Sequence, residues 1–92
     1  MSEELRLKES IAKADRAERI MTDPLVVDAL DKMRSTLYHN IETSGWRARG
    51  EREEAYRLLK LLGRFKAEFE AYMRDGKVSR SKLEQLTNKI MR

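Results

Sequence analysis

The sequence predicts an all-α protein, a small bundle of three long helices plus a short C-terminal helix, dominated by a helical hairpin. Three observations lead to this prediction. The chain has one Pro and four Gly in 92 residues. It is rich in Ala, Leu, Glu, Lys and Arg, which favour helix. Its apolar residues recur at intervals of three and four. The length fits a single helical domain, residues 1–92, with helices at about 3–21, 24–43, 51–75 and 81–91.

The first expected helix, residues 3–21, has a narrow apolar face. The residues that share this face are Leu7, Ile11, Ala14 and Met21, with Glu18 interrupting them. A short helix with so little apolar surface is marginal in water. We therefore expect it to pack on another part of the protein.

The second expected helix, residues 24–43, begins at a clear signal. Asp23 suits the N-cap position, and Pro24 suits the first turn. The apolar stripe that follows has helical spacing and consists of Val26, Leu30, Met33, Leu37 and Ile41. Residues 43–50 then break the pattern and predict a loop.

The third expected helix, residues 51–75, carries the strongest pattern in the chain. Ala55, Leu58, Leu62, Phe65, Phe69 and Tyr72 follow a strict heptad spacing. Such a seam is typical of helix interfaces between subunits, and four apolar helix faces are more than a thin bundle easily buries. We therefore expect a homo-oligomer, with an interface formed by Leu58, Leu62, Phe65, Phe69 and Tyr72.

Three further signals, each containing a glycine or a serine, complete the prediction for the C-terminal half of the chain. Gly63 lies inside the third helix, and we interpret it as a place where another helix or the Trp46 ring comes close. Asp75-Gly76 predicts a helix stop. Ser81 with Glu84 has the spacing of a capping box, which predicts a short fourth helix over residues 81–91.

The predicted loop holds the only tryptophan, Trp46, between arginines. Trp46 closes the core between two helices, anchors a protein interface, or stacks on a base of a nucleic acid. The sequence leaves these three alternatives open. The residues that would contact a protein or nucleic-acid partner are Trp46, Arg47, Arg49, Arg52, Arg57, Lys60 and Arg64.

Charge is unevenly distributed along the chain. Residues 1–46 hold seven Lys/Arg and nine Asp/Glu, whereas residues 47–92 hold thirteen and seven. The halves therefore carry formal charges of −2 and +6. A basic half of this kind suits DNA or an acidic protein, but three cations on one helix face support at most sequence-independent, salt-dependent binding.

The residue types in the chain do not predict an enzyme. The chain has no Cys and a single His, His39, so neither a zinc site nor a nucleophilic triad has its usual residues. Gly45 and Gly50 have P-loop spacing, but Glu51 and Arg52 replace the required Lys and Ser/Thr. We expect no enzyme, no metal, no cofactor and no small-molecule substrate. The charged N-terminus and short apolar runs predict neither a signal peptide nor a membrane span.

The stretch around residues 23–80 resembles a family. Its elements are Asp23-Pro24-Leu25, Trp46, the run from Arg52 to Leu62, Phe65, Phe69 and Gly76-Lys77-Val78. It is similar to short helical proteins of tailed phages and prophages encoded near head and DNA-packaging genes. The resemblance implies a non-enzymatic role in assembly, packaging or host takeover, in the host cytoplasm or in the virion.

These observations lead to two functional hypotheses. The first is a structural, assembly or DNA-packaging-associated phage protein that acts as a helical homo-oligomer. The alternative is a small monomeric regulator that binds nucleic acid or a host factor through the Trp46 loop.

Overall fold

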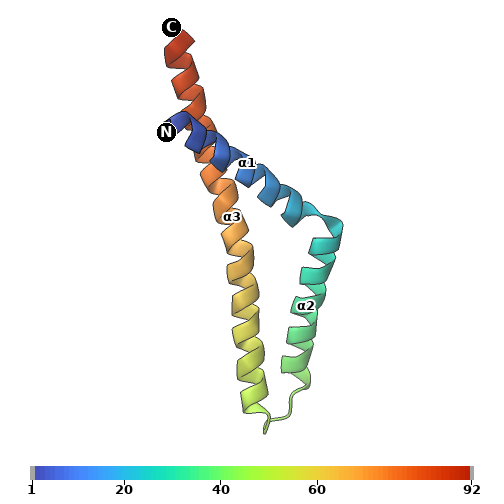
Figure 1. The fold of residues 1–92 in the computed structure, drawn as a ribbon. Helices are drawn as coiled ribbons and strands as arrows, with labels where there is room; N and C mark the ends of the chain where they lie inside the picture. Colours follow the sequence, from blue (N-terminus) through green and yellow to red (C-terminus); the bar gives the residue numbers. More distant parts are fainter. Residues whose placement is uncertain (1, 92) are drawn as a thin grey trace. The chain divides into compact units, whose positions relative to one another are not determined.

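The computed structural model describes residues 2–91, which form three α-helices and, within that range, no strand (Figure 1). The helices are α1 (Glu3–Thr22), α2 (Pro24–Thr43) and α3 (Arg49–Met91). The all-α prediction is confirmed. Helices α1 and α2 lie within one residue of the ranges expected from apolar spacing.

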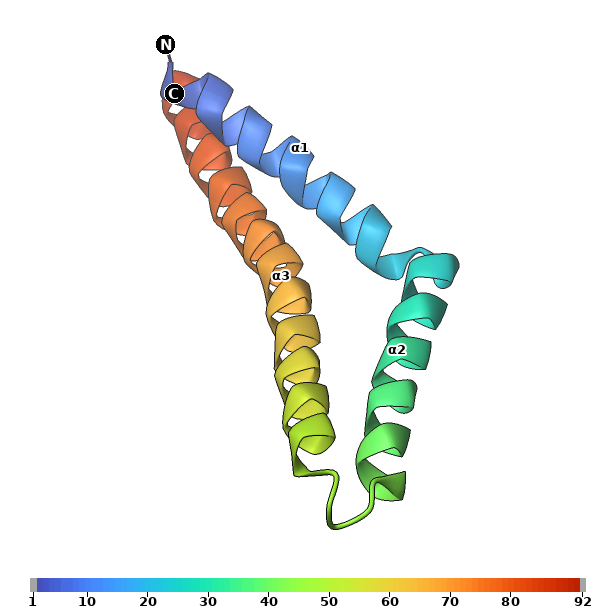
Figure 2. The same ribbon diagram turned by 60° about the horizontal axis from the view of Figure 1, so that its bottom comes forward.

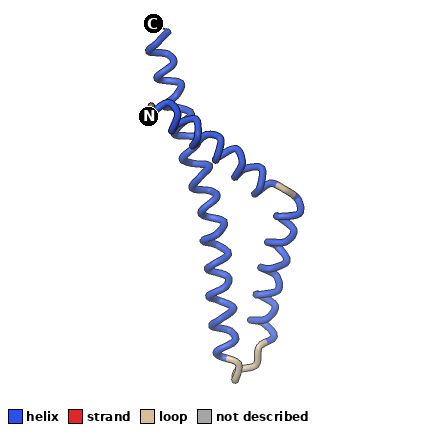
Figure 3. The backbone as a smooth tube through the Cα atoms, viewed as in Figure 1, coloured by secondary structure: helices blue, strands red, loops and turns tan. Residues whose placement is uncertain are grey.

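Two short breaks separate the helices (Figure 3). At the first, Asp23 has an extended backbone, and its Oδ1 accepts a hydrogen bond of 2.8 Å from the Leu25 amide. This contact satisfies an amide that the first turn of α2 leaves without a helical partner, and Pro24 occupies a position that needs no amide. The second break is the loop at residues 44–48.

Helix α3 differs from the prediction because it runs for 43 residues without interruption. The expected stop at Asp75-Gly76 and the separate short helix over 81–91 are therefore wrong. Ser81 does not begin a helix. Beyond Tyr72 the heptad spacing continues to the end of the helix through Gly76, Ser79, Leu83, Leu86 and Ile90.

The chain divides into two compact units, each containing part of α3. The first, which we call the terminal unit, combines the chain up to Met21 with the part of α3 from Glu68 onward. Within it, α1 lies along the C-terminal part of α3 (Figure 2). The second, the hairpin unit, spans Thr22–Ala67 and contains α2, the loop and the first part of α3.

Small side chains bring the two helices of the terminal unit together. Ala14 and Ala17 are buried on α1, and Gly76 and Ser79 are buried on α3. A methyl group added at Gly76 would overlap the Ala14 methyl and would lie 3.3 Å from the Ser10 carbonyl oxygen. Because Gly76 has no side chain, α1 can pack directly against α3 at this position. This packing stabilises the helical conformation of Gly76. This tertiary contact overrides the local stop signal.

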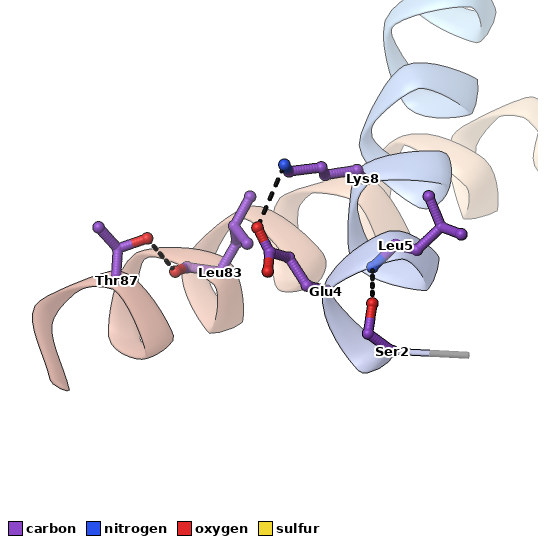
Figure 4. A network of polar contacts seen from close by, with 6 residues as sticks. All are labelled: Ser2, Glu4, Leu5, Lys8, Leu83 and Thr87. Atoms are coloured by element: carbon purple, nitrogen blue, oxygen red, sulfur yellow. Dashed lines mark hydrogen bonds and ion pairs between the residues drawn. The ribbon is translucent and has the colours of Figure 1, made fainter. Parts of the chain in front are cut away.

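Polar contacts in the terminal unit add little to this packing. In Figure 4 no dashed contact joins α1 to α3. The Lys8–Glu4 ion pair lies within α1, the Leu5 amide donates to Ser2 just before that helix, and the Thr87 hydroxyl donates to the Leu83 carbonyl within α3. Between the helices, Arg80 pairs with Asp15 at 3.3 Å, with both side chains about half exposed. Exposed pairs of this kind contribute less than about 1 kcal/mol.

The aromatic end of the terminal unit is held differently. Phe69 and Tyr72 meet edge to face, with ring centroids 5.9 Å apart. The Lys13 ammonium of α1 lies 4.1 Å from the Tyr72 ring centroid. These contacts anchor Tyr72 within the unit.

The hairpin unit has almost no core of its own. Ala55 is its only buried residue, and no residue of α2 is buried. Nine of the fourteen large apolar residues that the described chain exposes belong to this unit. Apart from Ala55, the residues of its apolar stripes are half-buried or exposed, so packing within this unit stabilises it less than a closed core would.

Candidate interaction surfaces of the hairpin unit

An open apolar groove runs between α2 and the first part of α3. Its volume is about 590 Å³, and its lining is almost entirely apolar. The residues that line it are Leu30, Lys32, Met33, Thr36, Leu37, Leu58, Leu61, Leu62 and Phe65. We call this surface the hairpin groove. Met33, Leu61 and Phe65 are each about half exposed or more, so the groove faces solvent along its length.

The five residues expected to form the oligomer interface are divided between the two units. Leu58, Leu62 and Phe65 line the hairpin groove. Phe69 and Tyr72 belong to the terminal unit, where they contact each other. The predicted seam therefore serves two different surfaces.

The heptad seam predicts only three of the residues that line the groove. Of the others, Leu30, Met33 and Leu37 belong to the apolar stripe of α2, Leu61 lies outside the seam, and Lys32 and Thr36 carry no apolar signal. Leu61 precedes a seam residue and is 60% exposed. The run Leu58-Leu59-Lys60-Leu61-Leu62 contains more leucine than a two-position seam requires, and this excess was the available signal.

The loop at the end of the hairpin is held by hydrogen bonds to one carbonyl. The Gly45 carbonyl oxygen accepts from the Ala48 amide at 2.9 Å and from Arg52 Nη1 at 2.5 Å. The Arg52 amide in turn donates to the Ala48 carbonyl at 3.1 Å. Arg52 therefore fastens the loop to the first turn of α3.

Trp46 projects from this loop into solvent. Its side chain is 80% exposed, and the Arg47 guanidinium carbon lies 4.8 Å from its ring centroid. The interpretation of Trp46 as the residue that closes the core is therefore wrong. Within one chain Gly63 is not a close-packing position, because a Cβ there would have no neighbour within 4 Å among the described residues.

Some of the predicted cationic contact residues form hydrogen bonds or ion pairs within the chain, and others do not. Arg49 donates through Nε to Glu53 at 3.1 Å, and Arg52 is committed to Gly45. Arg57, Lys60 and Arg64 are exposed and form no ion pair with any residue from 2 to 91. They lie at steps of three and four along one flank of α3, where Arg57 and Arg64 are four residues before and three residues after the groove-lining Leu61.

The described residues form neither a metal-binding cluster nor a membrane-spanning helix. No group of three or more His, Asp or Glu side chains is placed to hold a metal ion over residues 2–91. No helix in that range combines the length and the apolar character that crossing a membrane requires.

Comparison with known proteins adds no relative. No protein family, no curated protein and no solved structure matches the chain. The function proposed below therefore depends on the residues and the geometry already described, together with the resemblance noted from the sequence.

Proposed function

We propose that the protein is a non-enzymatic, phage-type structural or assembly protein that acts as a helical homo-oligomer, with the hairpin groove as its subunit interface. The observation that carries the proposal is the hairpin unit, which buries only Ala55 yet exposes an apolar groove of about 590 Å³. Open apolar surfaces of this kind mark interaction sites.

A second copy of the same hairpin is the occupant that fits the groove best. Both walls of the groove are amphipathic helices, so two copies related by a twofold axis would bring apolar faces together from both sides. The α3 wall also has heptad spacing, which suits packing of side chains between helices. Four helices would then enclose the leucines that two helices leave open.

A charge inside the groove tests this interface. Leu61 is 60% exposed, so Leu61→Glu disturbs the fold of one chain little but places a carboxylate in the proposed contact. We expect the mass in solution to fall to that of a single chain. Leu25→Glu is the matched control, since Leu25 is 76% exposed and does not line the groove. Unchanged mass in Leu61→Glu, from an oligomeric parent, would reject the groove as the interface.

The phage setting is supported by the resemblance of residues 23–80 to short helical proteins encoded near head and packaging genes. It is tested by the genes that flank the coding sequence. Portal, capsid or terminase genes beside it would support an assembly role. An operon of metabolic genes would contradict it.

One observation favours the second candidate, a monomeric regulator that binds a host factor or nucleic acid through the loop. An exposed Trp46 with Arg47 stacked on it, on a loop fastened by Arg52, is an arrangement typical of an interaction hot spot. A single-chain mass for the wild-type protein, with partner binding lost in Trp46→Ala, would favour this candidate over the oligomer.

A further inference from the structure

Met33 is the one methionine among residues 2–91 that lines the hairpin groove. It is 52% exposed, so solvent reaches this side chain in a single chain. The other residues of the groove are aliphatic or aromatic, apart from Lys32 and Thr36. Met91, which lies outside the groove at the end of α3, is 82% exposed and offers an internal comparison. The groove therefore holds one side chain that mild oxidation can convert from apolar to polar.

The chemistry of this conversion requires only a peroxide. The sulfur lone pair attacks one oxygen of hydrogen peroxide, the O–O bond breaks, and an S–O bond forms. The sulfur is oxidised by two electrons. The leaving hydroxide takes the proton from the transferred oxygen and becomes water. The product is methionine sulfoxide, which is polar where the thioether was apolar and which reductases convert back to methionine.

A sulfoxide at Met33 would be poorly accommodated in a closed contact between two copies. The groove lining is almost entirely apolar. Lys32, the cation in that lining, already pairs with Asp28 at 3.3 Å. The sulfoxide oxygen would therefore give up hydrogen bonds to water without an equivalent partner in the contact. We expect association to weaken by about tenfold or more for each oxidised chain.

We propose that Met33 is a reversible oxidation site, and that its conversion to the sulfoxide by a peroxide separates the subunits. This inference rests on the proposed function, because it takes the hairpin groove as the subunit interface. A second copy covers Met33 in the assembly, so oxidation proceeds through the free chain. Met33 should therefore react more slowly as the protein concentration rises, whereas the reaction of Met91 should not change.

The test treats the whole chain with dilute hydrogen peroxide and follows three quantities over time. Peptide mass spectrometry locates each added oxygen atom, light scattering gives the mass in solution, and circular dichroism gives the helix content. We expect the mass to fall towards that of one chain in step with oxidation of Met33, with the helix content retained. Oxidation of Met91 alone should leave the mass unchanged.

Substitutions separate the effect of Met33 from other effects of the oxidant. Met33→Leu removes the sulfur but keeps an apolar side chain of similar size, so it should stay assembled after peroxide treatment. Met33→Gln places a polar group in the groove and should reproduce the oxidised state without peroxide. Met91→Leu and Met91→Gln are the matched controls, and both should behave as the wild-type protein does.

The outcomes distinguish this inference from the proposed function. An assembly that persists after complete oxidation of Met33, or a Met33→Leu variant that still dissociates in peroxide, would overturn the inference and leave the groove interface standing. Loss of helix content together with loss of mass would also overturn it, because oxidation would then act by unfolding the chain. A single-chain mass before any treatment would reject the proposed assembly itself, and this inference with it.

Discussion

Ala14 of α1 faces Gly76 of α3 so closely that a methyl group on Gly76 would overlap the Ala14 methyl. Gly76 is buried inside a continuous helix, where glycine is normally unfavourable by about 1 kcal/mol relative to alanine. The close approach of the two helices offsets this loss, because it buries Ala14 and Ala17 against α3.

This contact predicts that Gly76→Ala destabilises the protein despite the higher helix propensity of alanine. The added methyl group must push α1 away from α3, and overpacking of this kind costs about 1–3 kcal/mol. Denaturant unfolding at fixed protein concentration measures the change. A stability equal to or above wild type would show that Gly76 and Ala14 are not in contact in solution.

Gly63→Ala is expected to have the opposite effect. A Cβ at Gly63 meets nothing within 4 Å, so the substitution introduces no overlap and should stabilise the helix by about 0.5–1 kcal/mol. The same unfolding measurement applies. Destabilisation would mean that another chain packs against Gly63, and the comparison with Gly76→Ala separates propensity from packing.

The different roles of these glycines explain where prediction from sequence failed in the fold. Apolar spacing and the Asp23-Pro24 signal were sufficient to locate α1 and α2. Asp75-Gly76 followed by Ser81 and Glu84 is a consistent local signal for a helix stop and restart, and only contact with α1 overrides it. The heptad spacing continues through Gly76 and Ser79 and so indicates an uninterrupted helix. Neither residue has a large apolar side chain, however, so a search for apolar spacing alone does not detect them.

Asp23→Ala is expected to weaken the start of α2. The Asp23 carboxylate accepts a 2.8 Å hydrogen bond from the Leu25 amide, and loss of such a cap typically costs about 1 kcal/mol. Asp23→Asn retains an acceptor and should remain close to wild type. Thermal unfolding of both variants checks the assignment, and equal stability of Asp23→Ala and wild type would contradict it.

Arg52→Ala is expected to loosen the Trp46 loop without unfolding the helices. The substitution removes the side chain that donates a hydrogen bond to the carbonyl of Gly45. Gly45 directly precedes Trp46 in the loop. Because Trp46 is the only tryptophan, its time-resolved fluorescence anisotropy reports on this loop alone. We expect faster local motion in Arg52→Ala and no change in Arg57→Ala. Identical motion in both variants would show that Arg52 does not hold the loop.

The candidate surfaces were only partly predictable for a related reason. The heptad seam identified Leu58, Leu62 and Phe65, but it did not show that the wall opposite consists of Leu30, Met33 and Leu37, because that depends on how α2 turns back along α3. Trp46 allowed three interpretations from sequence. Its 80% exposure removes the core interpretation and leaves the two contact roles.

The absolute mass of the wild-type protein in solution tests the central claim most directly. Light scattering behind a sizing column, over a range of protein concentrations, gives this mass without a partner or a label. We predict a mass equal to two or more whole chains of 10.8 kDa, because in the proposed assembly a second copy covers the hairpin groove. A mass of 10.8 kDa at every concentration, from a fully folded sample, would contradict the proposed assembly.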